Sequence, residues 1–363
     1  MKNIFLSYGA LITPLGNTVD ANFEAMKRGV CGIKNVGDSG FNKEKWPLGK
    51  INSIEGENRY TELLNRLCEA LLAEHPATLF QAQSTLLIVS STKADINLLP
   101  DDTFASTRSI LHEKLKLKND ALIISNACIS GVLAINTAAD YINSGKYKTA
   151  IVIGIDALSD FIVYGFQSLF ALSSQVSKPF DKNRQGISIG EAAGAIIVSS
   201  EKLNDTSFYV NYLGGSSSND ANHISGPSRT GEGLYRSVTK TLNRSNVSPE
   251  NIDFISAHGT GTAYNDEMES IAFDRLQLND TPLNSFKGYF GHTLGAAGII
   301  ELIMTMSMME NNLMLKSMGF DTLGLSKELN VLTHNCEKAI NIALKTASGF
   351  GGGNASVLIK KAT

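Results

Sequence analysis

The chain lacks the features that mark several classes of protein. Its 363 residues include only four cysteines, none in Cys-x-x-Cys spacing, so the sequence predicts neither a metal site nor a disulfide framework. Charged residues make up 18% of the chain and leave a net charge of -3, without a long run of either sign. This balance excludes the basic surface of a nucleic-acid-binding protein and the polybasic patch of a membrane-surface protein.

Long hydrophobic runs are also missing. No apolar stretch approaches the roughly 20 residues that span a bilayer, so we expect no membrane segment. Residues 1–16 begin with a Lys and a short apolar run, but Pro14 interrupts them and no small-residue cleavage pattern follows. We expect a first strand and a turn there rather than a signal peptide. The few scattered cysteines predict a location in the reducing cytoplasm.

Apolar residues are abundant, at 43% of the chain, and short strand-like runs alternate with longer helical patterns. The predicted strands cover residues 85–90, 121–125, 150–155, 194–199 and 356–359. The predicted helices cover residues 60–74, 129–143, 234–244 and 297–310. This alternation is typical of an α/β fold in which helices cover sheets.

The order of these segments also indicates a duplication. Residues 125–131 lead from a strand into an apolar helix, and residues 291–298 open a second apolar helix. Each half of the chain therefore presents a reactive side chain where a loop meets a helix. The polar stretch 200–206 lies between them. We predict two domains, residues 1–205 carrying the reactive cysteine, Cys128, and residues 206–363 carrying both reactive histidines, His258 and His292.

Cys128 is the first candidate for chemistry, because it stands between a strand and a helix of small, apolar residues. At a helix N-terminus the free N–H groups and the helix dipole favour a thiolate. The same N–H groups are suited to hold an oxyanion. The alternative is a buried structural cysteine, the usual fate of a free thiol.

His258 lies in the segment Ala-His-Gly-Thr-Gly-Thr, after a predicted strand at residues 252–256. The glycines allow a tight turn and a close approach of a ligand. Thr260 and Thr262 stand two residues apart, so in an extended segment both hydroxyls face the same side and can bond the amides of a bound arm. The alternative is a histidine that caps a turn.

His292 and Lys287 belong to one short segment, residues 287–295, which precedes the second apolar helix. By themselves they equally fit a core histidine and a surface charge. Phe350 stands in a glycine-rich run, residues 349–354, that comes before a strand. That position excludes a dinucleotide-binding loop, which joins a strand to a helix. We expect a flexible loop in which Phe350 acts as a gate and its backbone N–H as an oxyanion donor.

Taken in order, the motifs resemble the ketoacyl synthase family, meaning the β-ketoacyl-acyl carrier protein synthases I and II and their type II polyketide relatives. One such motif is modest support, whereas the whole series in the family's order is highly specific. The matching segments are residues 12–16, 127–131, 171–173 with 179–184 and 190–194, the His258 segment with Asn265, Asp266 and Glu269, residues 287–295, and the Phe350 loop.

The resemblance implies the thiolase-like fold, two similar α/β halves in five α-β-α-β-α layers, and a dimer. It implies a triad of Cys128, His258 and His292, with Lys287 and Glu269 in a charge network that orients the histidines. It further implies substrates on the phosphopantetheine arm of an acyl carrier protein, and no metal or separate cofactor. Ser225 would then lie beside the pantetheine channel with the two threonines, and Phe166 would line the acyl pocket.

The implied activity is decarboxylative Claisen condensation in fatty acid or polyketide elongation. Departures from the pattern leave a second reading open. The chain is short for the family around residues 91–107, and Phe170 stands where many relatives carry an Arg for the carrier protein. The alternative is therefore a ketosynthase of a specialised type II polyketide or aryl polyene pathway, working as a heterodimer with a non-identical subunit. A non-elongating partner subunit and a thiolase-like or hydrolytic enzyme are weaker candidates. Arg59 and Arg66 are guesses for carrier docking.

Overall fold

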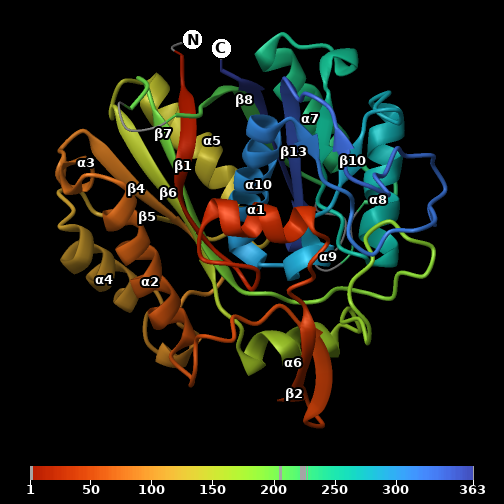
Figure 1. The fold of residues 1–363 in the computed structure, drawn as a ribbon, viewed down its shortest axis with the longest axis horizontal. Helices are drawn as coiled ribbons and strands as arrows, with labels where there is room; N and C mark the ends of the chain where they lie inside the picture. The colour runs from red at the N-terminus through yellow and green to blue at the C-terminus, as the bar shows by residue number, and fades with distance from the viewer. Residues whose placement is uncertain (1–2, 204–206, 221–225, 227, 363) are drawn as a thin grey trace.

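A computed structural model describes residues 3–203, 207–220, 226 and 228–362 (Figure 1). The strands are β1 (Phe5–Ile12), β2 (Lys34–Ser39), β3 (Glu44–Leu48), β4 (Thr85–Ser90), β5 (Leu122–Ile124), β6 (Thr149–Asp156), β7 (Ala192–Ser199), β8 (Val210–Asn219), β9 (Phe254–Ser256), β10 (Leu283–Asn284), β11 (Leu313–Met314), β12 (Cys336–Glu337), β13 (Ile342–Gly349) and β14 (Gly353–Lys361). The α-helices are α1 (Val19–Lys27), α2 (Arg59–Glu74), α3 (Ala77–Gln81), α4 (Ala105–Leu115), α5 (Ser130–Asn143), α6 (Asp160–Ser168), α7 (Glu232–Ser245), α8 (Ala263–Arg275), α9 (Lys287–Phe290) and α10 (Ala297–Asn311). The predicted strands and helices are all present, and residues 5–12 form strand β1 as expected.

The main sheet repeats one pattern twice. Its strand order is β10-β9-β13-β14-β8-β1-β7-β6-β4-β5, so five strands from each half of the chain lie in mirrored order. Strands β5, β4 and β6 are parallel, as are β10, β9 and β13, and the inner strands of each half are antiparallel. The two halves join through β1 and β8, which pair at only two positions, Phe5 with Asn211 and Leu6 with Val210.

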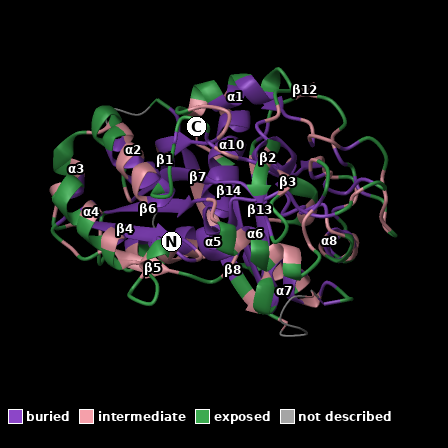
Figure 2. Cartoon of the chain, turned by 90° about the horizontal axis from the view of Figure 1, so that it is seen from below, coloured by how far each residue is buried: buried purple, intermediate pink, exposed green. Residues whose placement is uncertain are grey.

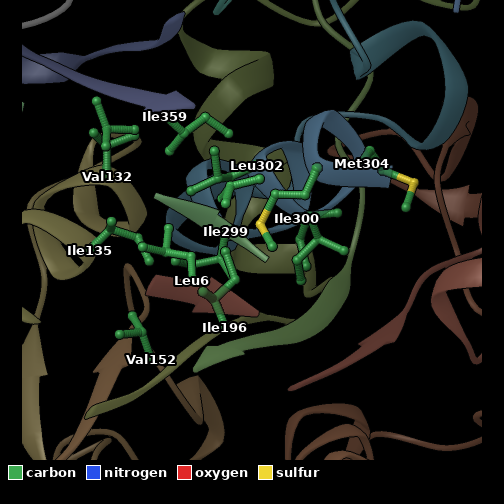
Figure 3. Packing of buried hydrophobic residues seen from close by; sticks show 14 of the residues in the cluster. Leu6, Val132, Ile135, Val152, Ile196, Ile299, Ile300, Leu302, Met304 and Ile359 are labelled. Atoms are coloured by element: carbon green, nitrogen blue, oxygen red, sulfur yellow. The ribbon is translucent and has the colours of Figure 1, made fainter. Parts of the chain in front are cut away.

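Three hydrophobic clusters show how the helices are layered on these strands. One cluster packs α2 and α4 against the first half, and another packs α7 and α8 against the second. The largest lies between the halves and includes α5 and α10 (Figures 1 and 3). In Figure 3, Ile299 and Ile300 of α10 lie among Leu6, Val132 and Ile196. The order is therefore helix, strand, helix, strand, helix, which confirms the predicted α/β thiolase-like fold of five layers.

The burial pattern of the helices follows from their layer. Helix α10 is mostly apolar and almost wholly buried, as expected of a helix enclosed between the two halves of the main sheet. Helices α2 and α7 each bury one face and expose the other, as expected of an outer layer. Figure 2 shows this distribution, with buried residues in the middle of the molecule and exposed ones on the outer helices.

The two central helices meet at their first turns through glycines. A Cβ atom on Gly298 would lie 2.6 Å from the backbone N of Val132, and one on Gly131 would lie 2.9 Å from the backbone N of Ile299. Only residues without a side chain allow the backbones to come this close. This crossing brings together the two loops that lead into α5 and α10.

The domain boundary at residues 205 and 206 falls outside the described residues and stays a prediction. Among the helices of the described part of the chain, none is long and apolar enough to cross a membrane.

Candidate active site

Cys128 lies at a sharp turn between β5 and α5. The preceding residue, Ala127, has a φ angle of 45°, a left-handed conformation that non-glycine residues seldom adopt. The Ser130 hydroxyl stabilises this turn, because it donates to the Ala127 carbonyl at 2.6 Å and accepts from the Asn126 N–H at 2.7 Å. The turn presents the thiol to a cavity while leaving the residue only 8% exposed.

His292 comes from the second half and contacts Cys128 directly. Its Nε2 atom lies 2.9 Å from the Cys128 Sγ, across the junction of α5 and α10. Gly291 before it has a φ of 81°, and a Cβ there would lie 2.8 Å from the Gly190 backbone N. The His292 N–H donates to the Ser188 carbonyl at 2.7 Å. The loop is thus fixed by backbone contacts to the first half of the chain.

His258 completes the group. It follows β9, is 3% exposed, and its ring stands nearly perpendicular to that of His292, at 84° with 5.3 Å between ring centres. Its Nδ1 lies 3.3 Å from the Lys287 ammonium, which can only donate a hydrogen bond. Nδ1 therefore carries the lone pair, and the ring proton is on Nε2.

Lys287 is buried, and its carboxylate partner is Glu301 of α10, at 2.6 Å. Glu269 was expected to join Lys287 in a charge network that orients the histidines, but no ion pair links its carboxylate to Lys287 among the described residues. Its oxygens accept the backbone N–H groups of His258 at 2.7 Å and of Gly259 at 2.6 Å. Glu269 thus holds the backbone of the His258 loop, while Lys287 contacts the His258 carbonyl and ring. Burial and the carboxylate of Asp266 raise the pKa of Glu269 to about 7.

Thr260 and Thr262 lie on the wall of a cavity of about 580 Å³ that reaches Cys128 and both histidines. Their hydroxyls are 2.8 Å apart, so they face the same side as the sequence predicts. Asp266 fixes this loop, because its carboxylate accepts the N–H of Thr260 at 2.9 Å. The lining is mostly apolar, with two hydroxyls at one wall, which suits a chain that carries amides.

Phe350 and Phe166 lie together in the same cavity, with their rings stacked and their centres 5.6 Å apart. Phe350 is 38% exposed and begins the turn between β13 and β14. The preceding Gly349 is close to the nucleophile, since a Cβ on it would lie 3.1 Å from the Cys128 backbone N. The Phe350 loop and the Cys128 turn are therefore neighbours.

Other predicted residues fall outside this group. Ser225 lies outside the described residues. Phe170 is 94% exposed at the edge of the cavity. Arg59 is wrong as a docking residue, because it is buried in an ion pair with Glu191. Arg66 is partly exposed and binds Glu62 on the surface of α2, at 2.7 Å.

The surroundings hold the reactive side chains in their neutral forms. Burial raises the pKa of Cys128 to about 12, although Lys287 lowers it. The thiolate that the helix N-terminus favours is thus opposed by loss of water. Burial and the nearby lysines hold the pKa of both His258 and His292 well below the usual range. The resting pair is a thiol that donates to a neutral imidazole.

A metal ion is the other occupant that such side chains suggest. The ligand atoms of Cys128, His258 and His292 lie within 4.8 Å of one another. A divalent cation would, however, share this buried site with the ammonium groups of Lys287 and Lys345 and be repelled by them. The arrangement favours a nucleophile with acid and base partners, as the sequence predicts.

Comparison with known families agrees with this reading. Residues 100–204 match the family described as "Beta-ketoacyl synthase, N-terminal domain", and residues 209–321 match "Beta-ketoacyl synthase, C-terminal domain". The chain belongs to the β-ketoacyl synthase family. It is 32% identical over 270 residues to 3-oxoacyl-[acyl-carrier-protein] synthase 2 of Rhizobium meliloti, covering 70% of this chain and 63% of that protein.

Two further relatives show the range of the family. The chain is 31% identical to a putative mitochondrial 3-oxoacyl-[acyl-carrier-protein] synthase of Schizosaccharomyces pombe, over 65% of this chain and 60% of that one. It is 26% identical to the ketoacyl synthase alpha subunit of the tetracenomycin polyketide synthase of Streptomyces glaucescens, over 66% and 59%. The chain thus covers about 60% of the length of the curated relatives it matches.

Solved structures support the fold over nearly the full chain. A chain of the ketosynthase and chain length factor complex from Xenorhabdus doucetiae matches with a TM-score of 0.85 and 26% identity, over 99% of this chain and 98% of that one. A β-ketoacyl synthase from Burkholderia phymatum matches with a TM-score of 0.88 over all of both chains. At 21% sequence identity, this match supports the fold only.

Sequence reasoning missed two members of the site, Glu301 and Lys345. Both are fully or almost fully buried, at 1% and 0% exposure. Glu301 had a signal, because it is one of only two charged residues, with Glu310, in a mostly apolar helix. Lys345 is the only charged residue of strand β13. An isolated charge in a buried element indicates that Glu301 and Lys345 each need a partner of opposite charge. The sequence does not show that the two residues pair with each other.

Proposed function

We propose that this chain is a β-ketoacyl-acyl carrier protein synthase that extends an acyl group on Cys128 by decarboxylative condensation with a malonyl thioester. The contact that carries the proposal is the 2.9 Å approach of His292 Nε2 to the Cys128 thiol, with His258 beside it. The arrangement supplies a nucleophile, a base for its proton, and a donor for a developing oxyanion.

The first step is acylation of the enzyme. As the Cys128 sulfur attacks the acyl thioester, its proton passes to His292 and then to the departing sulfur of the carrier's phosphopantetheine arm. The tetrahedral oxyanion would be stabilised by the backbone N–H groups of Cys128 and Phe350, whose loops are adjacent. The arm would lie against Thr260 and Thr262, and no cofactor beyond that arm is required.

The second step makes the carbon nucleophile. The bond between the malonyl carboxylate and its α-carbon breaks, CO₂ leaves, and negative charge moves to the thioester oxygen. His258 has its proton on Nε2 and would donate to that oxygen. His292 has by then returned the thiol proton to the departing sulfur, and it would join His258 as a donor in the tautomer that carries the ring proton on Nε2. The enolate carbon then forms a bond to the acyl carbonyl. Collapse of that adduct releases the Cys128 thiolate and a product two carbons longer.

Partners and location belong to the same proposal. The substrates would arrive on an acyl carrier protein, and the chain would act as a dimer in the cytoplasm. A ketosynthase of a type II polyketide or aryl polyene pathway, paired with a non-identical subunit, is the second candidate. The structural match to the ketosynthase and chain length factor complex, which covers 98% of the matched chain, supports this candidate.

Purified protein tests the main proposal directly. Incubation with an acyl carrier protein that holds a radiolabelled acyl group should add one acyl mass to Cys128, and malonyl carrier protein should then release CO₂ and an extended product. We expect Cys128→Ser to abolish the adduct and His258→Ala to keep the adduct but lower CO₂ release about 10²-fold or more. Cys336→Ser, at a half-buried thiol on β12, is the matched control.

Two outcomes would overturn the proposal. One is condensation that survives in the Cys128→Ser variant. The other is hydrolysis or cleavage of acyl thioesters without any need for malonyl substrate.

Co-expression with the genes next to this one, followed by measurement of molecular mass, separates a homodimer from a complex with a non-identical subunit.

A further inference from the structure

Lys345 is a buried cation that the condensation steps above do not use. It lies on β13, five residues before Phe350, and is 0% exposed. Its Nζ is 2.5 Å from Glu301 Oε2, an ion pair without hydrogen-bond geometry at that oxygen. The same ammonium donates to the carbonyls of Ser256, at 3.2 Å, and Ala257, at 3.3 Å. These two residues immediately precede His258.

Glu301 is therefore shared by two lysines. Lys287 binds its Oε1 at 2.6 Å, and Lys345 approaches its Oε2. Lys287 also contacts the carbonyl and the Nδ1 of His258. Two lysines thus lie at one carboxylate beside the two histidines; burial lowers the pKa of Lys345, and the neighbouring Glu301 raises it. An ion pair that served only to stabilise the fold would need one lysine, and a second adds a desolvation cost.

We propose that Lys345 is a positioning residue of the condensing site, which fixes Glu301 and the backbone before His258 and supplies the second positive charge that keeps both histidines neutral. This inference rests on the proposed function, because neutral imidazoles are the donors that the enolate step requires. The charge lies among fully buried side chains, where it is screened little.

The charge of Lys345 acts on the pKa of both histidines in one direction. Lys345 is among the groups that lower the pKa of His258 and of His292, after burial and Lys287. Removing its charge should let both imidazoles take up a proton at higher pH. The titratable and charged groups around them are Cys128 on the α5 side, Glu269 on α8, Lys287 on α9, Glu301 on α10 and Lys345 on β13.

The test is Lys345→Met, a change of similar volume that leaves Lys287 and Glu301 as a balanced pair, so we expect the variant to fold. The rate of CO₂ release from malonyl carrier protein is measured from pH 5 to 9. We expect the acidic limb of this profile to move to higher pH, so that the ratio of the rate at pH 5 to the rate at pH 8 falls several-fold below that of the wild type. Lys345→Arg, which keeps the charge, should restore the profile. Lys240→Met, at an exposed lysine on α7, is the control.

A second readout does not depend on condensation. The rate at which iodoacetamide alkylates Cys128 reports the protonation of its partner His292, and its pH dependence should shift in the same direction in Lys345→Met. If Lys345→Met does not fold, Lys345→Gln, which keeps a donor but no charge, is titrated instead.

The outcomes separate the two proposals. A wild-type protein that neither condenses nor decarboxylates malonyl thioester overturns the proposed function, whereas the alkylation profile still tests Lys345. An active wild type whose two pH profiles are the same in Lys345→Met and Lys240→Met overturns the role of Lys345.

Discussion

At the scale of single residues, the site depends on ionisable side chains that burial holds in their neutral forms. The thiol of Cys128 and the imidazole of His292 are both neutral because water is excluded from them, and they meet at 2.9 Å. A buried neutral histidine lowers the free energy of unfolding at acidic pH, because the histidine binds a proton in the unfolded chain but not in the folded chain. This cost is measurable without any substrate.

We predict that His292→Asn makes the protein less sensitive to acid. The folded pKa of His292 lies below the unfolded value of about 6.5, so its contribution to stability is complete above that pH and is lost as pH falls below it. Between pH 7.5 and 5.5 the wild type should lose about 1 kcal/mol more unfolding free energy than the variant. Urea unfolding at the two pH values measures this. His112→Asn, on the exposed face of α4, should behave like the wild type, and an equal pH response in all three proteins contradicts the prediction.

Residue-level prediction from the sequence was good where a local motif carries the chemistry. Cys128, His258 and His292 each stand at a strand or helix boundary with small neighbours, and the structure brings the three together. It was weaker for the charged groups behind them. Glu269 holds backbone amides, and Lys287 pairs with Glu301 on another helix. Pairing of that kind depends on how distant elements pack, which spacing along the chain does not encode.

At the scale of elements, the crossing of α5 and α10 decides where the nucleophile and its base meet. The two helices touch backbone to backbone at Gly131 and Gly298, directly after the loops that carry Cys128 and His292. An added side chain there must push the helices apart. The distance between the thiol and the imidazole would then grow by the same movement.

We predict that Gly131→Ala lowers the free energy of unfolding by about 1–3 kcal/mol, since its Cβ would lie 2.9 Å from the Ile299 backbone N. The rate of acylation at Cys128 should fall as well, because the thiol and the imidazole move apart. Gly165→Ala in α6 is the matched control, because a Cβ there meets nothing within 4 Å and alanine favours a helix by about 0.5–1 kcal/mol. Thermal denaturation and the rate of acylation at Cys128 are measured for both. Equal stability of the two variants would show that the crossing tolerates a methyl group.

Elements with a strong period were predictable, and others were not. Helices α2, α5, α7 and α10 and the apolar strands begin and end within three residues of their predicted ranges. Helix α6 and strands β8 and β13 were missed. Strand β13 carries a buried lysine and β8 is rich in serine and glycine, so neither has the apolar alternation of a typical strand. Partners in the sheet stabilise them instead.

At the scale of the whole molecule, the two halves share one sheet and one central layer. Their strands are joined at β1 and β8, and α5 and α10 belong to the same hydrophobic cluster. The predicted division at residues 205 and 206 would therefore separate two copies of a repeated pattern of elements that share one central core. The resemblance to a known family predicted this layering; composition alone predicted only an α/β fold.

We predict that the halves unfold together. Cys68 is fully buried in the outer layer of the first half, so its alkylation in urea reports that layer, while far-ultraviolet circular dichroism reports the whole chain. The two transitions should have the same midpoint. Exposure of Cys68 at a clearly lower urea concentration, with most of the dichroism retained, would indicate that the first half unfolds by itself.

The site takes its nucleophile from one half of the chain and its histidines from the other, and this division makes the protein suitable for fragment complementation. A chain cut between β7 and β8 would yield one piece with a thiol that has no base and another with imidazoles that have no nucleophile. Neither piece would carry out the reaction, and activity would return only on reassembly. The broad face between α5 and α10 would hold the pieces together, and acylation of Cys128 would report their association.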